Sequence, residues 1–436
     1  MSGTPTTPFG KQFREKYFAF DPTYTPLNHG SFGATPKPVL AAQEAERATF
    51  VANPDKYLLH DLSDKIDSAR KIVAGLVNAP SVDNLVFVTN ATIGVNTVLR
   101  SWRFRPGDVV ISASTTYGAC YKTLDFLVQQ QGIVHERVPL HYPLRDEDEV
   151  VELYKATLDA AREKHGHDSV KFLFFDGVSS MPGCRLPWEK LIELARAEGV
   201  LSFVDAAHSI GLLEGIDLTA HEPDFYVSNL HKWYFTPTPA AFLYIKNGLH
   251  DQIQSFPVSH SFISFDTDGG HGNKLLKEKF SFIGTADYSN PIVVDAARKF
   301  RNEVCGGEHA IKDYCYNIAV KGAELFARTV PGVSVFETYT SPAPGSHSTN
   351  TSMINLLLTH PKLDYTIAAS PERTAELTTI ALAISKRLLH DHNVVFPFFA
   401  YDGKLMFRLS GQVYLDEADF EKGAEALKSV LEAYFA

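Results

Sequence analysis

Residues 201–211 read L-S-F-V-D-A-A-H-S-I-G, and residues 225–237 read F-Y-V-S-N-L-H-K-W-Y-F-T-P. These two stretches are the strongest indication of the fold. Each opens with a short, mostly apolar run and then turns to small, polar and charged residues. Such runs are typical of strands buried on both faces, as in a parallel sheet. Because ligands gather beyond the carboxyl ends of such strands, the polar residues after each run are candidate site residues.

The same alternation extends through the first two thirds of the chain. Between the apolar runs lie amphipathic segments, and we predict helices at 147–164 and 188–198. Strands that alternate with helices predict an α/β domain with a mainly parallel sheet between helices. The predicted strands are residues 85–89, 109–113, 170–175, 201–204, 225–228 and 240–245.

From residue 291 onwards the pattern changes to longer helices with fewer strands, which predicts a smaller α+β domain. The predicted helices are 297–303, 308–329, 372–389 and 416–435, and the predicted strands are 333–337, 353–358 and 405–409. We therefore expect three parts. They are an extended N-terminal segment, residues 1–34, that packs near the cleft, a large domain, residues 35–290, and a small C-terminal domain, residues 291–436.

The composition excludes several classes of protein. The 436 residues are 44% hydrophobic and 21% charged, which is typical of a globular protein. Lys+Arg 41 against Asp+Glu 51 gives a net charge of −10, which argues against a nucleic-acid partner. No apolar run approaches the roughly 20 residues that span a bilayer, and Met1–Lys11 lacks the apolar region of a secretory signal. We therefore expect no membrane association and a cytoplasmic location. The four cysteines form no C-x-x-C pair, and no metal site is predicted.

An anion site is predicted at residues 89–94, T-N-A-T-I-G, where a buried strand turns into a helix. Free N–H groups at a helix start, with the Thr92 hydroxyl beside them, suit a phosphate group. The alternative is a simple helix cap, because Asn and Thr cap helices without any ligand. Neither a P-loop nor a dinucleotide-binding glycine motif follows a predicted strand.

Two further strand ends carry Asp205 and Lys232. A carboxylate directly after an apolar strand needs a partner, and burial lowers the pKa of a lysine and makes it a nucleophile. Taken singly, each residue could have a purely structural role. Asp205 could simply accept hydrogen bonds from backbone amides, and Lys232 could be a solvated surface lysine. Together with a phosphate site they are what pyridoxal phosphate requires, and Tyr117, after a third strand, is placed to stack on its ring.

These stretches resemble the class V aminotransferase family of fold-type I pyridoxal phosphate enzymes, in particular its isopenicillin N epimerase-like branch. Further motifs follow the family's order along nearly the whole chain: L-N-H-G-S-F-G (27–33), N-A-T-I-G-V-N-T-V-L-R (90–100), T-T-Y-G-A-C (115–120), S-S-M-P-G (179–183) and F-R-L-S-G-Q-V-Y-L (407–415). The resemblance implies a seven-stranded type of sheet in the large domain, bound pyridoxal 5'-phosphate, and a homodimer with shared active sites.

The resemblance also assigns roles to residues. Lys232 would bind the cofactor covalently and move the Cα proton, and Asp205 would keep the pyridine nitrogen protonated. His208 would lie near the phenolic oxygen, and Tyr117 would stack on the ring and supply a second proton donor. The other predicted cofactor residues are Ala91, Thr92, Ser180, Asn229, His231 and Thr285, the last reaching the phosphate of the other subunit.

The predicted substrate residues lie in three separate stretches of the sequence, 27–33, 53–60 and 407–415. Arg408 would bind the α-carboxylate of an amino acid, since its planar fork can bond both oxygens. The remaining predicted substrate residues are Asn28, His29, Ser31 and His60. Two departures from the family fall at this pocket: residues 53–60 read N-P-D-K-Y-L-L-H where relatives carry a Phe-Leu-Arg, and residues 259–280 are compact where relatives carry insertions.

The implied reaction takes place at Cα and Cβ of an amino acid. We favour C–S bond cleavage in a cysteine-derived substrate, giving pyruvate and ammonia. A Mannich-type carbon–carbon bond-forming cyclase of secondary metabolism and an amino-acid epimerase are the alternatives, because within the branch the chain is similar to fungal sulfoxide lyases and to loline-type cyclases. A persulfide-forming desulfurase is disfavoured, since the last cysteine, Cys315, lies in a predicted helix. A cofactor-binding protein without turnover is also disfavoured.

Overall fold

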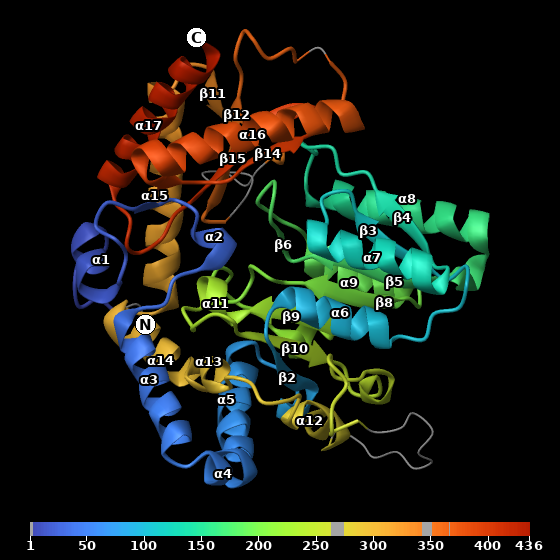
Figure 1. The fold of residues 1–436 in the computed structure, drawn as a ribbon. Helices are drawn as coiled ribbons and strands as arrows, with labels where there is room; N and C mark the ends of the chain where they lie inside the picture. The colour runs from blue at the N-terminus through green and yellow to red at the C-terminus, as the bar shows by residue number, and fades with distance from the viewer. Residues whose placement is uncertain (1–2, 263–273, 342–350, 366) are drawn as a thin grey trace.

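The large sheet confirms the predicted α/β architecture. The computed structural model describes residues 3–262, 274–341, 351–365 and 367–436 (Figure 1). The sheet has seven strands in the order β2-β10-β9-β8-β5-β3-β4, and only β10 runs antiparallel to its neighbours. The strands are β2 (Leu85–Val88), β3 (Val109–Ala113), β4 (Val134–Val138), β5 (Val170–Asp176), β8 (Leu201–Asp205), β9 (Phe225–Asn229) and β10 (Ala241–Ile245).

Helices cover both faces of this sheet, which explains the continuous apolar runs. In β5, Phe172 and Phe174 belong to the core cluster that includes α6 (Ala91–Ser101) and α7 (Gly118–Gln131). Their neighbours Leu173 and Phe175 belong to the other cluster, with α8 (Glu147–His165), α9 (Trp188–Ala197), α3 (Lys37–Ala52) and α5 (Leu62–Leu76). Since alternate residues of one strand enter two cores, nearly every position must be apolar.

An edge strand and two very short strands were not predicted from the sequence. The edge strand β4 reads V-H-E-R-V, and four of its five side chains are not fully buried. An edge strand with one open side can carry charged residues, so its pattern does not stand out. The two-residue strands β6 (Val178–Ser179) and β7 (Cys184–Arg185) are too short to give a pattern, although their turn contributes to the site.

The small domain has its own antiparallel sheet in the order β11-β12-β15-β14. The strands are β11 (Val333–Val335), β12 (Met353–Leu358), β14 (Phe398–Tyr401) and β15 (Lys404–Ser410), and only β14 was not predicted. Three long helices pack against the sheet and each other, as predicted: α15 (Glu308–Thr329), α16 (Pro371–His392) and α17 (Glu417–Phe435). The predicted helix at 297–303 is α14 (Val294–Lys299) followed by a π-helical turn, Phe300–Val304.

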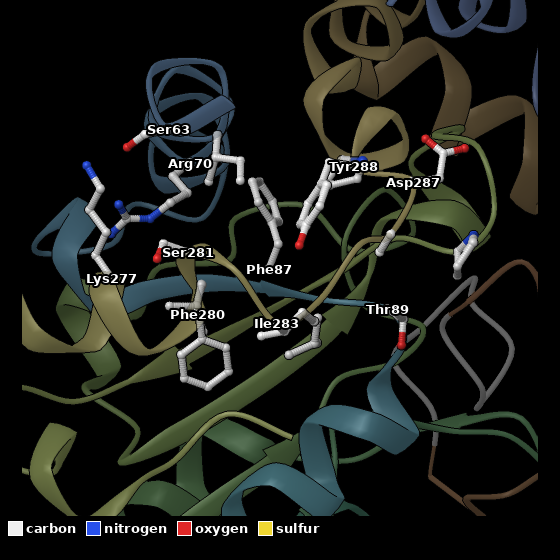
Figure 2. A pocket seen from close by; sticks show the side chains of 16 residues that line it. Ser63, Arg70, Phe87, Thr89, Lys277, Phe280, Ser281, Ile283, Asp287 and Tyr288 are labelled. Carbon is white, nitrogen blue, oxygen red and sulfur yellow. The ribbon is translucent and has the colours of Figure 1, made fainter. Parts of the chain in front are cut away.

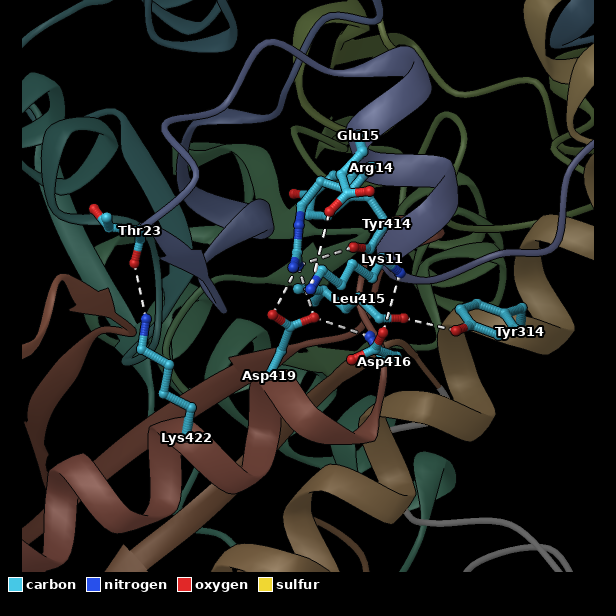
Figure 3. Close-up of polar contacts among 10 residues, drawn as sticks. All are labelled: Lys11, Arg14, Glu15, Thr23, Tyr314, Tyr414, Leu415, Asp416, Asp419 and Lys422. Atoms are coloured by element: carbon cyan, nitrogen blue, oxygen red, sulfur yellow. Dashed lines mark hydrogen bonds and ion pairs between the residues drawn. The ribbon is translucent and has the colours of Figure 1, made fainter.

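The N-terminal segment packs on the small domain (Figure 3). Arg14 in α1 (Lys11–Tyr17) donates to both Asp419 carboxylate oxygens at 2.7 Å. Lys422 donates to the Thr23 carbonyl at 2.8 Å, and β1 (Thr25–Pro26) pairs with β13 (Val394–Val395). These contacts position the next element, α2 (His29–Phe32), at the cleft. The exact division at residues 34 and 290 stays a prediction.

Two features are absent from the described residues. No helix there is both long and apolar enough to cross a membrane. No group of three or more His, Cys, Asp or Glu side chains in these residues is arranged to hold a metal ion.

Candidate active site

A cleft beyond the carboxyl ends of β8 and β9 holds most of the predicted site residues. Lys232 lies in α11 (Leu230–Trp233), which follows β9 directly, and lines a cavity of about 200 Å³. The other predicted residues that line it are Ser31, Ala91, Thr92, Tyr117, Ser180, Asp205, His208, Asn229 and His231. Segments far apart in sequence therefore meet at one sheet edge, as the strand-end argument predicts.

The surroundings of Lys232 favour its neutral, nucleophilic form. Loss of water around its amine lowers its pKa to about 8; the negative charge of Asp205 opposes this effect and the positive charge of Arg408 adds to it. Its Nζ lies 3.4 Å from His208 Nε2. A useful share of the amine is therefore unprotonated near neutral pH, which both covalent attachment and proton transfer require.

Asp205 and Asp176 lie side by side at the ends of β8 and β5, paired in register. Asp205 accepts hydrogen bonds from Cys120 Sγ at 3.3 Å and from the Ala207 N–H at 3.1 Å. Burial raises the pKa of both carboxyls, and that of Asp176 lies well above its usual range. Asp205 has the nearby Lys232 amine and two donors to stabilise its anion, so Asp205 is the carboxylate suited to a cationic partner.

The predicted anion site lies at the start of α6. Asn90 caps the helix by accepting from the Ile93 N–H at 2.9 Å, and the Ala91 N–H donates to Asn229 Oδ1 at 2.8 Å. His231 is held through Nδ1, which lies 2.7 Å from the Ala240 carbonyl oxygen, so Nε2 is its nitrogen available to a ligand. The same turn can therefore cap the helix and bind an anion, because Thr92 and the His231 imidazole still line the cavity.

The arginine side of the cleft is built from β15, α2 and the turn after β6. Arg408 is fully buried, and burial lowers its pKa to about 10, so it stays cationic at neutral pH. Its Nη1 donates to the Ser180 carbonyl at 2.6 Å, and its Nη2 lies 3.3 Å from Asn28 Oδ1 and from Ser31 Oγ. Its Nε has no partner among the described residues. An unmatched buried guanidinium donor suits a carboxylate.

The two sides touch directly. Gly33, at the end of α2, has a φ of 72°, and a Cβ there would clash with the His231 carbonyl oxygen. Only glycine lets the N-terminal turn lie this close to the turn that carries Lys232. His29 is buried behind the cleft, where its Nδ1 lies 2.8 Å from the Tyr414 hydroxyl and its ring packs edge-on against Trp233.

Five predicted residues do not line the cavity. Arg408 and Asn28 bond to Ser31, which lines it, and His29 lies behind it, whereas His60 and Thr285 lie elsewhere in this chain. His60 is exposed on the helical segment Tyr57–Asp61, and Thr285 is exposed and lines a different pocket that includes Tyr57 and Asp287. The role predicted for Thr285 concerns another subunit and stays a prediction. Part of the compact stretch 259–280 lies outside the described residues.

The chain also has a mainly apolar pocket between β2, α5 and residues 277–291 (Figure 2). Its lysine, Lys277, forms an ion pair with Asp67. It contains none of the predicted catalytic residues, so the cleft at Lys232 is the candidate active site.

Sequence analysis missed Asp176, Cys120 and Phe32, all of which line the cleft. Asp176 had a usable signal, because it follows an apolar run just as Asp205 does. Cys120 lies three residues after Tyr117, on the first turn of α7, and its thiol proton donates to Asp205. Nothing in the sequence marks that contact, since it joins residues 85 positions apart.

Comparison with known families decides the class. The family model described as aminotransferase class-V matches residues 32–305, a span that holds Lys232, Asp205 and the anion site. The chain belongs to the class V aminotransferase family. It is therefore an enzyme that uses pyridoxal phosphate. The buried Lys232 amine, the Asp205 carboxylate and the start of α6 match the three features of that cofactor: its aldehyde, its pyridine nitrogen and its phosphate.

The relatives cover between about half and nearly all of the chain. The L-cysteine desulfhydrase-like protein lolT1 of Epichloe uncinata is 30% identical and covers 98% of this chain and 96% of its own length. The hercynylcysteine sulfoxide lyase of Schizosaccharomyces pombe is 28% identical over 95% of this chain and 96% of its own. The isopenicillin N epimerase of Amycolatopsis lactamdurans is 34% identical over 52% of this chain and 55% of its own.

Solved structures share the fold. A mutant of C-DES with glycine covalently linked to its PLP cofactor superposes with a TM-score of 0.71 at 17% identity and covers 95% of this chain and 98% of that chain. The cysteine desulfurase CsdA of Escherichia coli gives a TM-score of 0.69 at 19% identity and covers 97% and 98%. These matches confirm the fold-type I architecture predicted from the sequence.

Proposed function

We propose that the protein is a C–S lyase that releases a sulfur-bearing group from Cβ of a cysteine-derived amino acid, with pyruvate and ammonia as the other products. The observation that carries this proposal is a desolvated lysine that lines the cleft beside a buried arginine that bonds two of the lining residues, Ser180 and Ser31. The lysine suits proton removal at Cα and the arginine suits the α-carboxylate. The names of the relatives support the choice of reaction, since lolT1 is named desulfhydrase-like and the yeast relative is named a sulfoxide lyase.

The fate of the sulfur follows from the cysteines. A desulfurase that keeps sulfur as a persulfide needs an accessible thiolate, whereas all four cysteines here are buried. Burial raises the pKa of Cys120, Cys184, Cys305 and Cys315, and that of Cys315 rises to about 12. Cys120 lines the cleft, but its raised pKa keeps it a thiol, which donates to Asp205. With no thiolate there to accept the sulfur, the sulfur fragment leaves the enzyme.

Each side chain has a distinct task in this proposal. Bound pyridoxal phosphate supplies an electron sink that makes the substrate Cα–H acidic. Asp205 holds a proton on the pyridine nitrogen through its negative charge, while the Cys120 thiol and the Ala207 N–H keep its carboxylate in place. Arg408, with Asn28 and Ser31 beside it, fixes the substrate carboxylate and so orients Cα.

Proton transfer falls to Lys232. Its pKa of about 8 lies close to the working pH, where a general base is most effective. The amine can take the Cα proton and later deliver it to the departing sulfur. Tyr117, which is 44% exposed at the cleft, has a hydroxyl that can serve as a second donor. The same groups would serve a carbon–carbon bond-forming cyclase or an epimerase if the substrate carried no leaving group at Cβ.

The predicted assembly and location belong to the same proposal. A homodimer would bring Thr285 of one subunit to the phosphate of the other, since Thr285 is exposed and outside its own cleft. The substrate is a small amino acid, and we place the enzyme in the cytoplasm.

A substrate panel tests the reaction. Purified holoenzyme is incubated with cysteine, cysteine S-conjugates and their sulfoxides, and pyruvate is measured. We expect pyruvate from at least one of them and none from the Lys232→Ala variant. Racemisation of an amino acid without pyruvate would favour the epimerase. If the whole panel gives no product, the lyase proposal is wrong and carbon–carbon chemistry takes its place.

A further inference from the structure

Trp233, the residue after Lys232, makes a hydrogen bond whose direction is fixed by chemistry. Its indole is buried, and Nε1 lies 3.2 Å from His208 Nδ1. An indole N–H is only a donor, so His208 Nδ1 must be the acceptor. An imidazole that accepts at Nδ1 carries its proton on Nε2.

His208 is held neutral, so this tautomer is the single state to consider. Burial is the main cause that lowers its pKa well below the usual 6.5. The charged and titratable groups that face it add to the effect: Lys232, Arg408, His29 and His231. A second proton on the ring is therefore unfavourable at working pH.

The Nε2–H of His208 lies on the cleft side. Nε2 is 3.4 Å from Lys232 Nζ, and His208 lines the cavity together with Lys232 and Asp205. A proton there makes His208 a donor toward the lysine. It would also make His208 a donor to the phenolic oxygen of a bound cofactor, the position predicted for this residue. The opposite tautomer would present a lone pair at the same place.

The indole has little freedom to turn away. The Trp233 carbonyl accepts from Arg301 Nη1 at 2.7 Å, and Arg301 also donates to the Gly211 carbonyl at 3.1 Å. Gly211 has a φ of 83°, and a Cβ there would clash with the Trp233 carbonyl oxygen. On its other side the indole packs against the His29 ring, at 4.7 Å between centroids. The backbone and the ring of Trp233 are therefore both fixed.

We propose that Trp233 is a positioning residue that locks His208 in its Nε2–H tautomer, so that His208 acts as a permanent neutral donor and not as a base. This inference rests on the proposed role of Lys232 as the cofactor lysine, and it does not depend on which bond the enzyme cleaves. In holoenzyme the lock would act on the protonation of the cofactor, because a donor at its phenolic oxygen would stabilise negative charge there and weaken the hold on a proton at the lysine nitrogen.

The first test is a pH titration of the cofactor's visible absorption in holoenzyme. Trp233→Phe keeps the ring but removes the donor, and we expect the pH midpoint to rise by about 0.5 to 1 unit, the effect of one hydrogen bond. Trp188→Phe is the matched control, since the buried Trp188 Nε1 has no partner among the described residues. We expect its midpoint to stay at the wild-type value. An equal midpoint in Trp233→Phe and wild type would overturn the lock.

The second test needs no folded variant of Trp233. Wild-type holoenzyme labelled with ¹⁵N-histidine is studied by NMR, and the His208 signals are identified by their loss in His208→Gln. We expect a protonated Nε2 and an unprotonated Nδ1 from pH 6 to 9. A proton on Nδ1 would contradict the proposal. Failure of the lysine assignment would show separately, as a visible absorption in Lys232→Ala that borohydride still reduces onto the polypeptide chain.

Discussion

The lysine side of the cleft and the arginine side are built in different ways. Lys232, Asp205 and His208 lie within three residues of the ends of two adjacent strands, β8 and β9. Arg408 comes from the small sheet, and its partner Asn28 is 380 residues away in sequence. One side is fixed by the register of a buried sheet, whereas the other depends on how the N-terminal segment packs on the small domain.

This difference separates cofactor chemistry from substrate recognition. We expect the lysine side to tolerate few substitutions, because its residues lie at or directly after the ends of strands that are buried on both faces. The arginine side can vary through α2 and the turn at Ser180, which both bond the guanidinium. Changes on the lysine side should therefore lower kcat, and changes on the arginine side should mainly raise KM.

Among the variants considered below, we expect Asp205→Asn to lower catalytic efficiency the most. Asp205→Asn keeps the shape but removes the charge, and we expect kcat/KM to fall by about 10²- to 10³-fold, as for the loss of other preorganised charges. Steady-state kinetics measure it. Asp176→Asn is the matched control at the neighbouring register position, where burial already favours the neutral acid. Equal losses in the two variants would show that the assignment of the charge to Asp205 is wrong.

The next effect lies on the arginine side. Arg408→Gln removes the cation, and we expect KM to rise by about 10- to 100-fold, the contribution of a charge-assisted hydrogen bond, with a smaller change in kcat. Arg408→Lys should recover only part of the loss, because an ammonium cannot bond both carboxylate oxygens. A fall in kcat at unchanged KM would place Arg408 in the chemical step and remove the contrast between the sides.

A pH effect of about tenfold is expected on the lysine side. The pKa of Lys232 is lowered to about 8, so its neutral fraction rises as the pH increases through 8. The rate at which apoenzyme takes up pyridoxal phosphate should therefore increase about tenfold from pH 7 to pH 9. Stopped-flow absorbance measures the rate. A flat profile, or one that rises only above pH 10, would mean that Lys232 is not desolvated.

The smallest catalytic effect concerns the N-terminal segment. Arg14 and Asp419 pair with little exposure, and Arg14→Met leaves a buried carboxylate without its partner (Figure 3). We expect the free energy of unfolding to fall by about 1 to 3 kcal/mol and KM to rise a few-fold, because α2 is less well held. Urea unfolding and steady-state kinetics measure both. The exposed pair of Lys11 and Glu15 is the control, and Lys11→Met should change neither. A rise in kcat/KM for Arg14→Met would contradict this account of α2.

The same contrast explains what the sequence could predict. Asp205, Lys232 and the start of α6 follow apolar runs directly, so strand-end logic found them and the family resemblance assigned their roles. The substrate roles of Asn28, Ser31 and Arg408 came only from the resemblance. The packing of Asn28 and Ser31 on Arg408 was not predicted, since no local pattern joins residues so far apart. The bond from Cys120 to Asp205 and the one from Trp233 to His208 were missed, because each depends on the tertiary arrangement of side chains.

All the roles assigned in the cleft rest on Lys232 as the lysine that binds the cofactor. Holoenzyme is reduced with borohydride and digested, and the modified peptide is identified by mass spectrometry. Lys279 is the internal comparison, because burial also lowers its pKa, although its amine is bound to the carbonyls of His250 and Ile253. We predict the pyridoxyl group on Lys232 and none on Lys279. A label on Lys279 or another lysine, or an unlabelled Lys232 in coloured enzyme, would contradict the account.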